Sequence, residues 1–336
     1  MVSSRSKTIL IEQLHELSID TTYLLPIESH TLPAQHPKRN PLDPPRLTYT
    51  PSWFALGAAA AALGGLGLRQ LGWGAAAGAG VLGAAVMAYM TRFEPAHPRL
   101  EHVTLRLPTL PRELDGLRIG QITDTHLGAK YTTRNLIWAI EQIERAQPEL
   151  LVITGDMAGK RKSIPEIAAL FGRLRAPLGI YAIPGNHDYW EGLADINAAL
   201  SVIGIPLLLN QNRRLRWNGA DFWLAGVDDV WDGDLDFAAA RAGIPTDAFT
   251  ILLAHAPDVA DEAAEHGFAL QISGHTHGGH LRLPALGPFA RPRFGMRYVM
   301  GHYQIGAMQL YVSRGLGGEA LRLFCRPEAT IFTLRQ

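Results

Sequence analysis

The chain has 336 residues, of which 47% are hydrophobic, and this is enough for one large folded domain or two ordinary ones. Basic and acidic residues number 31 each, so the formal net charge is zero, and the clustered positive excess that nucleic-acid binding needs is missing. The single cysteine, Cys325, excludes an intrachain disulfide and a cysteine-based zinc site, and it fits a reducing compartment.

Residues 1–50 are expected to form an N-terminal segment and a linker. Residues 8–17 have the apolar spacing of a short amphipathic helix, which lies either on a protein surface or against a membrane. Prolines recur every few residues from 33 to 51, which disfavours both helix and sheet. This stretch is therefore predicted to be extended.

Residues 51–92 are predicted to form a transmembrane helical hairpin. Between residues 53 and 90 the only strongly polar side chains are Arg69 and Gln70, and most of the rest are Ala, Gly, Leu and Val. Helices can be drawn over 53–68 and 71–90, each near the lower length limit for crossing a bilayer, and their small residues favour close packing. The alternatives are one long tilted span, or one helix and a re-entrant piece.

Basic residues flank this stretch on both sides. They are Lys38, Arg39 and Arg46 before it, and Arg92, Arg99, Arg106 and Arg112 after it. The positive-inside rule favours a hairpin that leaves both flanks in the cytoplasm. The sequence therefore predicts a protein of the inner (cytoplasmic) membrane, attached through residues 53–90, with its C-terminal domain in the cytoplasm.

Residues 93–336 are predicted to form one layered α/β domain, because short apolar strands alternate with helices. The expected strands cover 103–107, 117–123, 150–154, 179–183, 222–227, 250–253, 269–273, 309–313 and 330–334. The expected helices cover 133–146, 164–174, 193–203 and 259–266.

Residue types that bind metals follow five of these strands. They are Asp124 and His126, Asp156, the run Asn186, His187 and Asp188, then His255, and finally His275 and His277 in the loop 274–280. Each group alone has an ordinary explanation, such as a helix cap for an aspartate or a surface loop for a histidine pair. Ligands bind at the carboxyl ends of strands in open α/β sheets, so the five groups together predict a metal centre.

These groups carry a resemblance to a known family. Asp-x-His, Gly-Asp, Gly-Asn-His-Asp, a single His and Gly-His-x-His, in this order over residues 118–334, resemble the calcineurin-like metallophosphoesterase superfamily. Residues 226–229, 278–279 and 312–317 resemble its bacterial membrane-associated YkuE/YaeI-type branch. That branch has Leu in place of Thr125 and Gln in place of His280, and neither position is a metal ligand.

The resemblance implies a sandwich of two mixed β-sheets flanked by helices, and a pair of divalent cations. Asp124, His126 and His277 would hold one cation, Asn186, His255 and His275 the other, and Asp156 would bridge them. Oxygen and imidazole ligands without a thiolate suit Mn²⁺, Fe or Zn²⁺, and we expect Mn²⁺.

Two such cations, roughly 3.5–4 Å apart, activate a bridging water for attack on phosphorus. His187 is then expected to be the general acid, with Asp188 orienting its ring. The predicted function is a membrane-anchored phosphodiesterase or pyrophosphatase, with a lipid-linked pyrophosphate such as UDP-2,3-diacylglucosamine as the specific substrate hypothesis. The alternatives are a broad phosphomonoesterase, a cyclic-nucleotide phosphodiesterase, or a non-catalytic metal-binding membrane scaffold.

One further segment is open to two interpretations. Residues 281–304 place aromatic and methionine side chains among four arginines. The segment is either a flap that faces lipid and phosphate, or a partly buried connection whose arginines are solvated.

Overall fold

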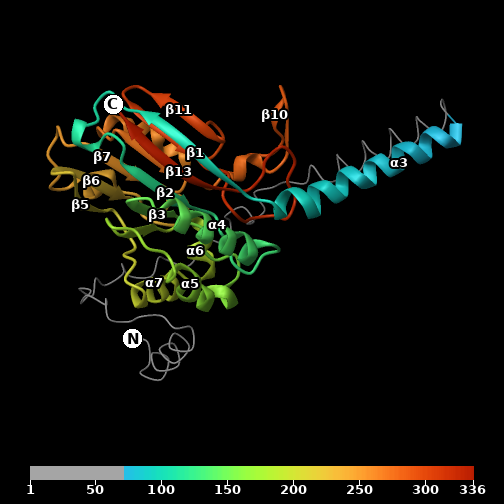
Figure 1. Ribbon diagram of the computed structural model, residues 1–336, viewed down its shortest axis with the longest axis horizontal. Helices are drawn as coiled ribbons and strands as arrows, with labels where there is room; N and C mark the ends of the chain where they lie inside the picture. The colour runs from blue at the N-terminus through green and yellow to red at the C-terminus, as the bar shows by residue number, and fades with distance from the viewer. Residues whose placement is uncertain (1–71) are drawn as a thin grey trace, which may run out of the picture.

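The computed structural model describes residues 72–336, and its centre is a pair of β-sheets (Figure 1). The strands are β1 (Arg99–Arg106), β2 (Arg118–Ile122), β3 (Leu150–Thr154), β4 (Ile180–Ile183), β5 (Gln211–Trp217), β6 (Ala220–Gly226), β7 (Thr250–Leu253), β8 (Leu270–Ser273), β9 (Arg282–Leu283), β10 (Gly287–Pro288), β11 (Gly301–Ile305), β12 (Met308–Val312) and β13 (Glu328–Arg335).

Helices lie before β1 and between five pairs of consecutive strands. They are α3 (Gly72–Ala88), α4 (Thr132–Ala146), α5 (Ile164–Phe171), α6 (Asn186–Glu191), α7 (Leu193–Val202), α8 (Phe237–Arg241) and α9 (Ala260–Glu265). Shorter helical turns are η1 (Tyr89–Phe93), η2 (Glu94–Ala96), η3 (Arg112–Leu114), η4 (Arg161–Ser163), η5 (Pro257–Val259) and η6 (His277–Gly279).

Both sheets are mixed, as the family resemblance implied. The first has the strand order β1-β13-β2-β3-β4, in which β13 and β2 are antiparallel and the other neighbours are parallel. The second has the order β11-β12-β8-β7-β6-β5, in which β12, β8, β7 and β6 are parallel and the two edge strands are antiparallel. The parallel strands β2, β3, β4, β7 and β8 end at the segments that carry the predicted site residues.

Three apolar layers hold the sandwich together. Residues of both sheets, such as Val152 and Phe332 from one and Phe222 and Ile272 from the other, form the core between the sheets. Helices α4, α5 and α7 cover the outer face of the first sheet, and α8 and α9 cover that of the second. The buried face of α4 repeats at the three- and four-residue spacing of an amphipathic helix. The predicted α/β sandwich of two mixed sheets is confirmed.

The sequence missed the two edge strands of the second sheet. In β5 only Leu215 is buried, and β11 alternates half-buried and exposed residues. An edge strand has one neighbour and keeps polar side chains, so neither segment shows the apolar run by which central strands were recognised. The sequence also missed α6, because Asn186–Glu191 has no apolar periodicity.

The N-terminal predictions are only partly covered by the described residues. The segment 1–50 and the first predicted helix, over 53–68, lie outside them. The second predicted helix, over 71–90, corresponds to α3, which continues into η1 and projects away from the sandwich (Figure 1). Within residues 72–336 no helix is both long and apolar enough to cross a membrane.

Candidate metal centre

The predicted site residues lie where parallel strands of the two sheets end. Asp124 and His126 follow β2, Asp156 follows β3, Asn186 begins α6 after β4, His255 follows β7, and His275 and His277 follow β8. All seven side chains are buried. The metal-ligand residues of the sequence analysis therefore lie at the ends of parallel strands of both sheets, of which β2, β3, β7 and β8 are central and β4 is an edge strand.

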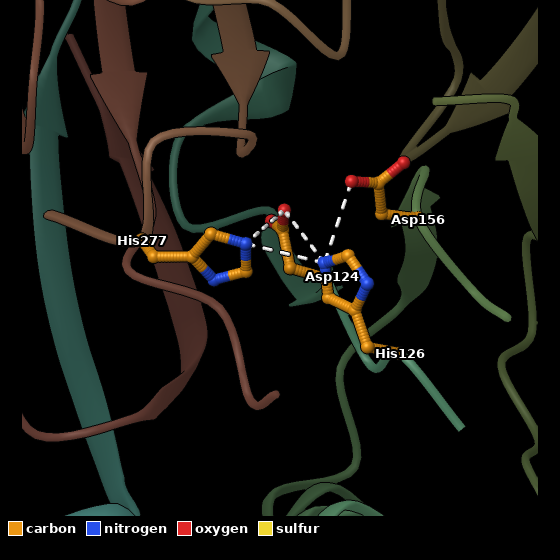
Figure 2. Close-up of side chains that lie close together, drawn as sticks. All are labelled: Asp124, His126, Asp156 and His277. Carbon is orange, nitrogen blue, oxygen red and sulfur yellow. Dashed lines mark hydrogen bonds and ion pairs between the residues drawn. The ribbon is translucent and has the colours of Figure 1, made fainter. Parts of the chain in front are cut away.

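A first group consists of Asp124, His126, Asp156 and His277 (Figure 2). Their facing ligand atoms all lie within 4.8 Å of one another. The His126 Nε2 atom is 3.4 Å from Asp156 Oδ2 and 3.2 Å from His277 Nε2, and His277 Nε2 is 3.6 Å from Asp124 Oδ1. Ligand atoms bound at about 2.0–2.2 Å from one cation come this close to each other, so the group has the spacing of a metal site.

A second group consists of Asp156, His255 and His275, with ligand atoms within the same 4.8 Å. His255 Nε2 is 3.3 Å from Asp156 Oδ2 and 3.3 Å from His275 Nδ1. Asp156 belongs to both groups. One carboxylate is therefore placed to contribute to two adjacent cation positions.

Backbone carbonyls fix the rings of two histidines in the second group. His255 Nδ1 lies 2.7 Å from the carbonyl of Thr154, and His275 Nε2 lies 2.7 Å from the carbonyl of Arg293. A ring nitrogen that donates to a carbonyl leaves the other nitrogen as an acceptor for a metal. Nε2 of His255 and Nδ1 of His275 are then the candidate ligand atoms, and these two atoms face each other.

Asn186 supplies an independent test of whether a cation fits. Its Oδ1 atom is buried, and no donor among the described residues bonds to it. A buried carbonyl oxygen without a donor costs about 1–3 kcal/mol, which a bound cation would offset. Asn186 follows Gly185, where an added Cβ would lie 2.3 Å from Asp156 Oδ1 and 2.7 Å from His255 Nε2. The orphaned oxygen and the donor set together fit a divalent cation.

The backbone around the site is strained. Six residues without the freedom of glycine have positive φ values here: Asp124, His126, Asp156, His275, His277 and His280. Such conformations are uncommon outside glycine and collect at functional sites, where the surrounding fold enforces them. Gly274 has a different reason to be glycine, because a Cβ there would lie 2.2 Å from Asp124 Oδ2.

Burial controls the protonation of these groups. It raises the pKa of Asp124 to about 7, and it lowers the pKa of His126 to about 3 and that of His275 to about 4. Burial also disfavours the charged form of His255, but the carboxylates of Asp156 and Asp124 outweigh it and raise its pKa to about 10. Most of the imidazoles thus favour the neutral form that binds metals, while the buried carboxylates require compensating positive charge nearby.

His187 lies beside the first group. Its ring is edge-on to that of His126, with centroids 4.5 Å apart, and it packs on the indole of Trp190 at 4.4 Å. Its backbone NH donates to Asp156 Oδ1 over 2.9 Å. The ring is half-buried, which leaves it accessible at the edge of the candidate centre.

Backbone NH groups hold the carboxylate of Asp188. Its Oδ1 atom accepts hydrogen bonds from the backbone NH groups of Met157 and Ala158, and its Oδ2 atom accepts one from Gly185. As the third residue of α6, Asp188 reaches back to the start of the helix, as in a capping box. Its carboxylate therefore ties the loop of Asp156 to α6.

Sequence reasoning also missed Arg322. This arginine is fully buried, donates to the carbonyls of Gly317 and Arg314, and has one guanidinium nitrogen 3.4 Å from His277 Nδ1. His280, left unassigned by sequence, is buried with its ring 4.7 Å from that of His277. The contact of Arg322 could not have been found from a local pattern, because it joins residues 45 positions apart.

An aromatic cluster borders the same site. The ring of Trp231 contacts those of Trp190, His275 and Phe294 at centroid distances of 5.6, 6.1 and 6.2 Å. The guanidinium of Arg293 lies over Phe294 and Trp231. Aromatic rings and the positively charged guanidinium of Arg293 thus lie together at the edge of the candidate centre.

The sequence of this chain is similar to those of known phosphoesterases. The family described as "Calcineurin-like phosphoesterase" matches residues 117–279. The chain is also 34% identical over 254 residues to "Uncharacterized metallophosphoesterase YkuE" of Bacillus subtilis, which covers 74% of this chain and 89% of YkuE. The chain belongs to the calcineurin-like metallophosphoesterase family. It is accordingly a metal-dependent phosphoester hydrolase, and the family uses a binuclear site of divalent cations.

Two further relatives of this metallophosphoesterase differ in length. "Phosphodiesterase YaeI" of Escherichia coli is 35% identical over 198 residues, which cover 56% of this chain and 71% of YaeI. "Transmembrane protein with metallophosphoesterase domain" of Danio rerio is 32% identical over 259 residues, which cover 71% of this chain. The chain spans 58% of that longer protein.

Proposed function

We propose that this metallophosphoesterase hydrolyses phosphodiester or pyrophosphate bonds at a membrane surface. The proposal of hydrolysis is supported by one observation above all: Asp156 belongs to both groups of facing ligand atoms. In this proposal Asp124, His126 and His277 hold one cation, Asn186, His255 and His275 hold the other, and Asp156 contributes to both. The absence of thiolate ligands favours Mn²⁺, with Fe or Zn²⁺ as alternatives.

A bound cation pair supplies Lewis acidity for the phosphoryl oxygens and activates water. Side chains and backbone groups of the protein supply the proton donor and hold the ligands in position. His187, at the rim beside His126, donates a proton to the leaving oxygen. Asp188 acts as a positioning residue, because it holds the Asp156 loop against the start of α6. The carbonyls of Thr154 and Arg293 keep His255 and His275 in one ring orientation.

Membrane attachment through residues 51–92 is supported by the surface of α3. The sequence of this helix contains no charged residue, and Val81 and Leu82 are 72% and 66% exposed. A helix that is apolar on exposed positions needs a covering, and a bilayer provides one. We place the catalytic domain, residues 93–336, on the cytoplasmic side of the inner membrane because basic residues flank this segment on both sides.

An enzyme held at a bilayer meets lipid headgroups directly, so we propose a lipid-linked pyrophosphate, such as UDP-2,3-diacylglucosamine, as the substrate. The relative YaeI, named a phosphodiesterase, agrees with cleavage of a diester-type bond.

A substrate panel tests this proposal. Detergent-purified full-length enzyme is compared on the lipid pyrophosphate, an aryl phosphodiester, an aryl phosphomonoester and a cyclic nucleotide. We expect kcat/KM to be at least about tenfold higher on the lipid substrate than on the aryl diester, because remote binding energy lowers the barrier.

Each other result has a defined meaning. A preference for the monoester or the cyclic nucleotide would replace the substrate with that alternative. Full metal content without hydrolysis of any compound would indicate the non-catalytic scaffold. A chelator-treated sample serves as the metal-free control.

A further inference from the structure

The large exposed apolar side chains of the described residues lie in three segments of the chain. Within residues 72–336 the large apolar residues that are exposed are Val81, Leu82, Val86, Met87, Tyr89, Phe93, Leu286, Phe289, Met296 and Phe324. They belong to α3 and η1, to the segment 281–300 around the β9–β10 hairpin, and to the loop 321–326. No other part of the described residues exposes a large apolar side chain. The distribution therefore points to one region of the surface as a contact site.

The three segments are packed against one another. Met90 forms a small buried cluster with Leu281 and Leu321, and its carbonyl accepts a hydrogen bond from Arg322 over 2.9 Å. The backbone NH of Phe324 donates to Glu94 Oε2 over 3.1 Å. Figure 1 shows β10 standing beside the base of α3, at the end from which α3 projects. The exposed residues near this junction therefore belong to segments that are packed together.

We call the five residues nearest this junction the apolar surface: Tyr89, Phe93, Leu286, Phe289 and Phe324. Leu286, at the tip of the hairpin, is 77% exposed, and Phe324 is 58% exposed. Phe324 also lines an open groove of about 470 Å³ with hairpin residues 282–285 and 287. Exposure of a large apolar side chain to water is unfavourable, and Leu286 and Phe324 are both exposed. A binding partner that covers this surface would remove that cost.

Positive charge predominates in the two segments beside α3, and the acidic side chain of Glu94 in η2 is buried. Segments 281–300 and 321–327 together contain six arginines and neither aspartate nor glutamate, although the whole chain has equal numbers of acidic and basic residues. The arginines are Arg282, Arg291, Arg293, Arg297, Arg322 and Arg326, of which Arg322 is buried and Arg297 pairs with Asp261. Arg291 and Arg293 are exposed. Apolar tips with an arginine rim match the interface of an anionic bilayer, where lipid phosphates lie above the acyl chains.

We propose that the catalytic domain itself docks on an anionic phospholipid bilayer through this apolar surface, with Leu286 and Phe324 entering the interface. This rests on the proposed membrane attachment and adds a second contact to it. The apolar sequence that begins at residue 53 runs directly into α3, whose base adjoins the hairpin. That continuity favours a bilayer over a second copy of the chain as the occupant.

Docking there would bring the candidate metal centre close to the headgroups. The segment that carries Leu286 also supplies the carbonyl of Arg293, 2.7 Å from His275 Nε2. It further contributes the carbonyl of Val299, which accepts a hydrogen bond from Thr276 Oγ1 over 2.6 Å. The lipid-facing tip and the loop of two candidate ligands are therefore parts of one packed unit.

Site-specific fluorescence tests the proposal on the full chain. Cys325 is buried, so it is replaced by serine in every variant, and an environment-sensitive dye is attached at Leu286→Cys, Phe324→Cys or Arg216→Cys. The last position is exposed on β5, at the end of the sandwich away from α3 (Figure 1). In anionic phosphatidylglycerol vesicles we expect blue-shifted emission and quenching by nitroxide lipids at 286 and 324, and neither at 216.

Two outcomes would overturn the proposal. Dyes at 286 and 324 that remain as aqueous as the dye at 216 would show that the domain does not touch the bilayer. Shielding that depends on protein concentration, without quenching by lipid nitroxides, would assign the surface to a second copy of the chain.

A kinetic arm separates this proposal from the substrate proposal. The double variant Leu286→Asp/Phe324→Asp is expected to lose about tenfold or more in kcat/KM on vesicle-embedded substrate, because two apolar contacts are replaced by charges. Its kcat/KM on a soluble aryl phosphodiester should be unchanged. Insertion of the dyes without hydrolysis of the lipid substrate would refute the substrate alone.

Discussion

Replacing Asp156 by asparagine is expected to lower kcat by about 10³-fold or more and to reduce the bound metal to one ion per chain or fewer. The carboxylate faces ligand atoms of both groups, with Oδ2 3.4 Å from His126 Nε2 and 3.3 Å from His255 Nε2. Losing the charge of a shared ligand weakens both cation positions, and metal-based charge stabilisation is worth several kcal/mol in such reactions. Steady-state kinetics and elemental analysis of the same preparation measure the two effects.

A matched variant controls for the chemical change. Asp221→Asn also converts an aspartate to asparagine, but this residue pairs with Arg214 on the surface of the β5–β6 hairpin. It should keep full activity and full metal content. If Asp156→Asn retained two ions per chain, the shared-ligand assignment would fail.

Replacing His187 by alanine is expected to lower kcat by about 10²–10⁴-fold on substrates with a poor leaving group, while metal content stays unchanged. The ring lies beside His126 at the rim but belongs to neither group of ligand atoms. A general acid matters least when the leaving group needs no proton. The loss should therefore be much smaller on a nitrophenyl ester, and a leaving-group series measures this dependence.

His102→Ala provides the comparison, because His102 is exposed on β1, in the edge strand of the first sheet. That variant should show no dependence on the leaving group. Equal losses across the series for His187→Ala would argue for a positioning role and against proton donation.

The central strands were the most predictable part of the fold. β3 was predicted with its exact bounds, Leu150–Thr154, because all five residues are buried and the run is continuously apolar. β5 was missed since it contains three arginines, two of them exposed, and a strand with one neighbour can keep such side chains in solvent. Hydrophobic periodicity in a sequence reflects which residues are buried. Strands and helices with many buried residues are therefore easier to predict than those with few.

The candidate site shows the same contrast between local and non-local information. The ordered motifs were recognisable because each group of metal-ligand residues directly follows its own strand. Since β2 and β3 are parallel neighbours, Asp124 and Asp156 lie together at the carboxyl ends of these strands. The partners of Asp188 were not predictable, since its contacts with Met157 and Ala158 join residues about thirty positions apart. Arg322 lies further still from His277, and only the folded loop places them together.

The number of divalent cations bound to the detergent-purified, full-length enzyme tests the central claim most directly. Elemental analysis after removal of loosely bound metal is predicted to give two ions per chain, because the donor atoms form two groups that share Asp156. A folded and hydrolytically active chain that carries no metal, or that retains two ions when both His255 and His277 are replaced by alanine, would contradict the account.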